Sequence, residues 1–274
     1  MDTSLSNPAS ANVNRWAIRL ARLGLVARGV VYLIIGGLAF LAAAGRGGQT
    51  TDREGAVQKI SEQPFGEPML WALALGVVGY ILWRWAQAIF DLEREGDDGK
   101  GLLKRTGYFA GGVIYAGLLV VTVKTAMGKA TGGGEQSTED WTAKLLEQPM
   151  GRWLVGGVAL IIVGVAAYQF IEAATCKFAR HLRGGELSAE QERWAIRAGR
   201  FGHAARGVAF LLIGWFMAQA AHQSQASEAG GMAQALATLS QQPYGMFLLG
   251  TVGAGLATFG IYSLVEARYR QIRT

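Results

Sequence analysis

The chain has 274 residues, of which 51% are hydrophobic and only 17% are charged, with 39 Gly and 5 Pro. This composition, with a mean hydropathy of +0.22, excludes an ordinary soluble domain. The net charge of +6 invites a nucleic-acid interpretation. However, the basic residues gather at the ends of apolar runs, where they set membrane topology, so no nucleic acid is expected as a partner.

Six apolar runs are long enough, or nearly so, to cross a bilayer core, which takes roughly 20 helical residues. Residues 1–18 before them are expected to form a cytoplasmic tail and a basic interfacial segment. The first run is too long for a cleaved signal peptide, and no clear cleavage site follows it. The sequence predicts an all-α polytopic membrane protein whose six transmembrane helices cover residues 23–44, 68–90, 107–128, 152–175, 200–221 and 246–265.

Each pair of runs is joined by a short polar stretch with apolar residues at helical spacing, at 54–63, 139–148 and 231–242. These stretches are predicted to be amphipathic helices on the outer membrane surface. Proline should end each short helix and open the next span. Each stretch closes on a Gln-Pro-x-Gly motif, whose fixed residues are Gln63, Pro64 and Gly66, then Gln148, Pro149 and Gly151, then Gln242, Pro243 and Gly245.

The same spacing occurs three times along the chain. Nineteen residues after each motif Pro stands an aromatic residue, and twenty-three after it stand Gln87, Glu172 and Glu266. Upstream, Gly24-x-x-x-Arg28-Gly29 aligns with Gly202-x-x-x-Arg206-Gly207, and the middle copy has Gly107 and Gly111 at these registers. Self-similarity of this kind predicts three tandem two-helix repeats about a pseudo-threefold axis. Their expected ranges are 19–95, 102–180 and 197–270.

These motifs resemble the bacterial membrane-protein family called domain of unknown function 1206. The likeness covers nearly all of the chain beyond the first dozen residues, and the middle copy departs from it because Gly111 replaces Arg. The resemblance implies three two-helix units and a bacterial inner-membrane location. It implies no activity, because the family is uncharacterised.

Lys and Arg are distributed unevenly between the two sides of the predicted bundle. They crowd residues 15–22, 94–105, 177–200 and 268–273, whereas residues 222–245 contain none. Since cytoplasmic loops of membrane proteins carry the excess of Lys and Arg, both termini are expected in the cytoplasm. On that side the basic residues should meet anionic lipid headgroups.

Ionisable residues at membrane depth are costly and commonly functional. Five polar residues should lie at one level near the cytoplasmic boundary: Arg28, Gln87, Glu172, Arg206 and Glu266. Arg28 is a natural partner for Glu172 or Glu266. The five residues could hold the bundle together or snorkel to the interface, or they could form a cytoplasmic gate. Arg84 is expected to snorkel beside Trp83 and Trp85, with a place in the site as the alternative.

The sequence contains no catalytic motif, so the protein is not expected to be an enzyme. No cofactor or metal is expected, because the three His have no matched partners and Cys176 is the single Cys. The favoured function is a small-solute or ion transporter or channel with a cytoplasmic-side polar gate. The alternative is a non-catalytic structural or partner-binding membrane protein. A homo-oligomer or an unknown protein partner stays open.

Overall fold

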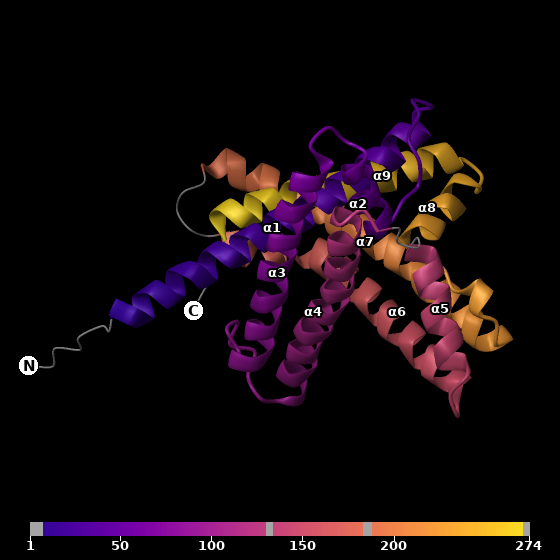
Figure 1. The fold of residues 1–274 in the computed structure, drawn as a ribbon, viewed down its shortest axis with the longest axis horizontal. Coiled ribbons are helices and arrows are strands. Elements are labelled where there is room, and N and C mark those ends of the chain that lie inside the picture. The colour runs from indigo at the N-terminus through magenta and orange to yellow at the C-terminus, as the bar shows by residue number, and fades with distance from the viewer. Residues whose placement is uncertain (1–7, 130–133, 183–187, 271–274) are drawn as a thin grey trace, which may run out of the picture.

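The computed structural model describes residues 8–129, 134–182 and 188–270. The described residues are all-α, and six helices in them are long and apolar enough to cross a membrane. The predicted fold class is therefore confirmed (Figure 1). The six long helices are α1 (Pro8–Ala43), α3 (Gly66–Phe90), α4 (Gly99–Ala126), α6 (Gly151–Thr175), α7 (Ala189–Gln223) and α9 (Gly245–Tyr269).

Three of these helices, α1, α4 and α7, begin well before the apolar runs predicted from the sequence. The Asp98 side chain accepts a hydrogen bond from the N–H of Gly101 at the start of α4. Ser188 and Gln191 form a capping box at the start of α7. These caps satisfy the free N–H groups of the first helical turn, so α4 and α7 can begin in the polar sequence before their apolar runs. At the chain's beginning, α1 starts at Pro8, so the described part of the expected interfacial segment is helical and continuous with the first span; residues 1–7 lie outside the described residues.

Three short helices precede the second span of each repeat. They are α2 (Arg53–Ser61), α5 (Gly134–Leu146) and α8 (Met232–Ser240), at the predicted places. Ala56, Val57 and Ile60 of α2 are buried, as are Met232, Ala235, Leu236 and Leu239 of α8. The first and third short helices therefore pack their apolar faces on the bundle. Short 3₁₀ segments, η1 (Lys177–Leu182) and η2 (Ala226–Glu228), complete the described elements.

The repeats join one another in a cyclic pattern. The second span of each repeat packs against the first span of the next: α3 against α4, α6 against α7, and α9 against α1. This cycle is the packing that a pseudo-threefold arrangement requires. Within the repeats, α1 packs against α3 and α7 against α9. We call one end of the bundle the terminal end. It carries the α3–α4 connection, the α6–α7 connection and the end of α9.

The middle repeat is open. Across the described residues α4 and α6 do not pack against each other, and the two helices diverge in Figure 1. A Cβ on Gly24 would lie 2.5 Å from the Cα of Tyr80, and one on Gly202 would lie 2.6 Å from the Cβ of Phe259, whereas Gly107 has nothing within 4 Å. The face that the first and third repeats bury is thus exposed in the second.

Candidate functional site

The terminal end of the bundle holds a buried ion pair between the first and third repeats. Nη2 of Arg28 lies 2.5 Å from a carboxylate oxygen of Glu266, and the two side chains are 8% and 6% exposed. Nε of Arg28 donates to the hydroxyl of Ser263 at 3.2 Å. Of the two partners considered for Arg28, the structure has Glu266, because α9 packs against α1 and α6 does not.

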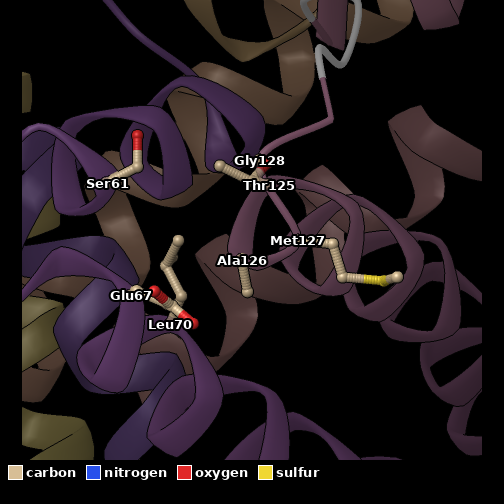
Figure 2. Close-up of a pocket in the computed structure, with 7 residues that line it drawn as sticks. All are labelled: Ser61, Glu67, Leu70, Thr125, Ala126, Met127 and Gly128. Carbon is tan, nitrogen blue, oxygen red and sulfur yellow. The ribbon is translucent and has the colours of Figure 1, made fainter.

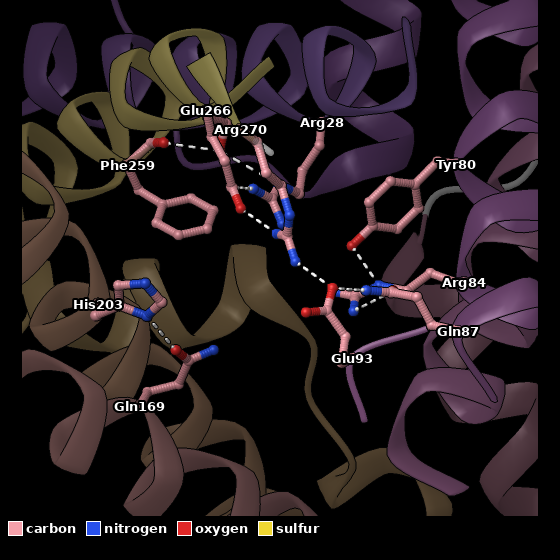
Figure 3. A network of polar contacts seen from close by, with 11 residues as sticks. Arg28, Tyr80, Arg84, Gln87, Glu93, Gln169, His203, Phe259, Glu266 and Arg270 are labelled. Atoms are coloured by element: carbon pink, nitrogen blue, oxygen red, sulfur yellow. Dashed lines mark hydrogen bonds and ion pairs between the residues drawn. The ribbon is translucent and has the colours of Figure 1, made fainter. Parts of the chain in front are cut away.

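This ion pair continues into a network that reaches the α3–α4 connection (Figure 3). Arg270 donates both to Glu266 and, at 2.6 Å, to Glu93. Glu93 accepts from the amide of Gln87 at 2.7 Å, and Gln87 accepts from Arg84 at 3.1 Å. Six side chains, from α1, α3, the α3–α4 connection and the end of α9, thus connect the third repeat to the first.

Two local features fix the ends of this network outside the spans. Burial acts to lower the pKa of Arg270, but Glu266 and Glu93 outweigh it and raise that pKa above its ordinary value. The N–H groups of Gly96 and Glu95 donate to Asp91 and lower the pKa of its carboxyl. These bonds shape the turn that carries Glu93 toward Arg270.

In the described residues, each interface between successive repeats contains a guanidinium group at an equivalent place in the bundle. At the α9–α1 interface Arg28 faces Ser263, which stands twenty residues after its motif Pro. At the α6–α7 interface, the residue twenty positions after the motif Pro is Gln169. When the Gln169 amide nitrogen donates to Nδ1 of His203 at 2.6 Å, its oxygen lies 3.1 Å and 3.2 Å from the terminal nitrogens of Arg206.

At the α3–α4 interface the guanidinium comes from the other helix. Arg84 occupies the register of Gln169 and Ser263, and its Nε lies 4.0 Å from the Cβ position of Gly111. Nε of Arg84 donates to the Tyr80 hydroxyl at 2.9 Å. The absence of Arg at Gly111 is therefore compensated by Arg84. The expectation that Arg84 snorkels to the interface was wrong, since its donors bond inside the bundle.

The predicted ring of five polar residues is only partly connected. The structure brings Arg28, Gln87 and Glu266 into one network. Glu172 is 7% exposed, and its Oε2 atom has no hydrogen-bond partner among the described residues. Arg206 lies on aromatic rings, 4.3 Å from the centroid of Phe259 and 5.1 Å from that of Tyr32.

Glu93 and Arg270 were not predicted as site residues, and Arg84 was considered for the site only as the alternative to snorkelling. Arg84 could have been found from its register, since Gln169 and Ser263 mark the same position in the other copies. Glu93 and Arg270 follow the ends of α3 and α9 and give no signal in a search limited to apolar runs.

The Gln-Pro-x-Gly motifs form the turns between the short helices and the spans. Phe65, Met150 and Tyr244 at the variable position have φ near +60° and are strongly exposed. A Cβ on the motif Gly would meet backbone oxygens of the preceding helix, as at Gly66, where Ile60 O would lie 2.6 Å away. Each Pro lies in the turn two residues before the span, so the expectation that it opens the span was wrong by that margin. The motif is a structural turn.

A hollow of about 400 Å³ lies beside Leu70 of α3 (Figure 2). It is at the end of the bundle opposite the network, because it adjoins the start of α3, whereas Gln87 lies near the end of that helix. Its lining comes from the end of α2, the start of α3 and the end of α4. Glu67 and Thr125 are polar members of a wall that also includes Leu70 and Met127. It is separate from the buried ion pairs.

Comparison with known proteins agrees with this architecture. The family model described as Domain of Unknown Function (DUF1206) matches three times, over residues 23–91, 106–175 and 201–270. The chain belongs to the DUF1206 family. It is 32% identical over 257 residues to the Uncharacterized protein YxxB of Bacillus subtilis (strain 168), which covers 94% of this chain and 92% of that protein. No solved structure matches the chain. This DUF1206 member is thus a multi-pass membrane protein of an uncharacterised family, and the predicted resemblance is confirmed.

Proposed function

We propose that this DUF1206 protein is a transporter or channel for a small solute or ion in a bacterial inner membrane, with both termini in the cytoplasm. The observation that carries the proposal is the open middle repeat. Gly107 and Ala110 of α4, and Ile161 and Val165 of α6, are exposed, although the matching residues of the other repeats are buried. α4 and α6 can therefore move relative to each other without breaking a packed interface within their repeat.

The polar network supplies the gate in this proposal. Arg28, Glu266 and Gln87 tie the first and third repeats together at the terminal end and hold that end closed. Buried ion pairs contribute little net stability, because desolvation offsets their attraction. Such a contact is suited to being exchanged between two arrangements. On the same side, anionic lipid headgroups would meet the basic loops.

A non-catalytic structural or partner-binding role is the second candidate. It is favoured by the aromatic packing between the repeats. Tyr32 and Phe259 are 0% and 1% exposed, and their ring centroids lie 5.0 Å apart in an edge-on contact. A centre filled in this way would serve a protein that only holds its helices together. Neither candidate is an enzyme.

A reversible lock of the middle repeat separates the two candidates. In the first repeat, Ala27 and Gly76 occupy the positions that Ala110 and Ile161 have in the middle repeat. These positions lie in contact there, since a Cβ on Gly76 would lie 2.9 Å from the Cβ of Ala27. We expect Ala110→Cys/Ile161→Cys, in a Cys176→Ala background, to form a disulfide when the repeat closes. In proteoliposomes, oxidation should stop solute flux and reduction should restore it.

The two single-cysteine variants are the matched controls, and oxidation should leave their flux unchanged. Flux would be followed by swelling of proteoliposomes in neutral sugars, amino acids and sodium salts of small anions. A protein that passes none of these solutes, and whose cysteine pair never forms a disulfide, would support the structural role instead.

A further inference from the structure

The centre of the bundle contains more positive than negative charge. Three guanidinium groups surround Tyr32, from Arg28 in α1, Arg53 in α2 and Arg206 in α7. Arg28 is paired with Glu266, which also pairs with Arg270. Within the described ranges, neither Arg53 nor Arg206 has a carboxylate partner. Both arginines are partly buried, and a partly desolvated cation is stabilised by a nearby counter-charge.

Arg53 and Arg206 contact the same side chain from different directions. Nη2 of Arg53 donates to the Tyr32 hydroxyl at 3.3 Å, and the Arg206 guanidinium lies over the Tyr32 ring at 5.1 Å from its centroid. Arg53 also lies over the ring of Tyr115, 5.3 Å from its centroid. The Nε atoms of both arginines are buried without a hydrogen-bond partner in the described chain. Two guanidinium groups thus converge on Tyr32, and each has an unused Nε donor.

The chemistry of these groups selects the ligand. Guanidinium presents a planar fork of donors that matches the oxygens of carboxylate and phosphate groups. Rings of Arg and Lys also select anions in membrane pores. We propose that Arg53 and Arg206 bind a small oxyanion, a carboxylate or a phosphate, beside Tyr32. As a substrate site this inference rests on the transport role proposed above; as a binding site it does not.

The position of the site fits a ligand that is exchanged. Tyr115 comes from α4, one of the two helices of the open repeat, and Arg53 comes from the short helix α2 at the end opposite the gate. The site is therefore bounded by an element that can move. It lies one helical turn from Arg28, since Tyr32 follows Arg28 by four residues in α1.

Ligand-dependent stability tests the site without requiring transport. The purified protein would be placed in nanodiscs of zwitterionic lipid, so that no anionic lipid competes, and its thermal unfolding followed in sodium phosphate, sodium acetate or sodium chloride of equal ionic strength. We expect phosphate or acetate to raise the midpoint by about 5 °C relative to chloride. Arg53→Gln and Arg206→Gln should each abolish this rise. Arg46→Gln, at an exposed arginine, is the matched control and should retain it.

The same variants distinguish an anion site from a structural role. In chloride alone, Arg53→Gln should unfold no earlier than the wild type, because it removes a partly buried cation that has no carboxylate partner in the described chain and whose Nε atom is buried without a hydrogen bond. Arg53→Lys, which keeps the charge, should retain part of the phosphate effect. A midpoint of the wild type that does not respond to either oxyanion would overturn the inference, and so would a response in Arg53→Gln and Arg206→Gln as large as in the wild type.

Uptake measurements separate this inference from the proposed function. Oxyanion-dependent stabilisation without phosphate or acetate uptake into proteoliposomes would leave the binding site standing and contradict oxyanion transport. Flux of a neutral solute by a protein that shows no oxyanion-dependent stabilisation would support transport and reject the anion site.

Discussion

At the residue scale, the Arg28–Glu266 pair gives the sharpest prediction. Glu266→Gln keeps the shape of the side chain but leaves two buried arginines, Arg28 and Arg270, without its charge. Breaking one side of a buried ion pair typically costs about 3–5 kcal/mol of stability. We expect a clear fall in the free energy of unfolding, measured by thermal or denaturant unfolding in nanodiscs.

Two further variants control this prediction. Glu62→Gln removes an exposed pair with Lys59 and should cost less than about 1 kcal/mol. Arg28→Met/Glu266→Gln removes one stranded cation along with the carboxylate, so it should be more stable than Glu266→Gln alone. If the double variant is less stable than the single one, the pair is not the source of the loss.

The sequence could place these residues at one level but could not pair them. Arg28, Gln87 and Glu266 stand at fixed registers from the repeat motifs, which was enough to predict their common depth. The choice of Glu266 over Glu172 depends on which helices are neighbours, and this is decided by packing between repeats. The same limit applies to Arg84. Its role could be predicted only with the knowledge that α3 packs against α4 near Gly111.

At the element scale, equivalent glycines should respond differently to one added methyl group. In Gly24→Ala the new Cβ would lie 2.5 Å from the backbone of Tyr80, so α1 and α3 must separate. Overpacking of this kind costs about 1–3 kcal/mol. Gly107→Ala adds its methyl group in open space, and alanine favours helix over glycine. We expect Gly24→Ala to lower the unfolding midpoint and Gly107→Ala to leave it unchanged or raise it.

This comparison also reports on the state of the middle repeat in a membrane. Equal losses from the two alanine variants would mean that α4 packs against α6 as tightly as α1 packs against α3. The open arrangement would then be contradicted. Gly202→Ala provides a second closed-repeat reference, since its Cβ would meet Phe259.

At the scale of the whole molecule, the sequence predicts three hairpins but not the open one. The closed repeats pack around Gly76 and Gly255, whose Cβ positions lie 2.9 Å and 2.4 Å from the Cβ atoms of Ala27 and Ala205. The middle copy has Ile161 at this register. A branched side chain cannot enter a space that excludes a methyl group. The substitution is visible in the sequence, but its effect depends on a helix contact that only the structure defines.

The orientation of the whole molecule can be tested at the two ends of the bundle. Arg46 and Asp97 are both exposed and follow α1 and α3, so they should lie on opposite sides of the membrane. In a Cys176→Ala background, a membrane-impermeant maleimide should label Arg46→Cys in intact cells, because the excess of Lys and Arg places the other end in the cytoplasm. Asp97→Cys should react only after permeabilisation. Labelling of Asp97→Cys in intact cells would place the buried network and both termini outside, and the polar network could not be a cytoplasmic gate.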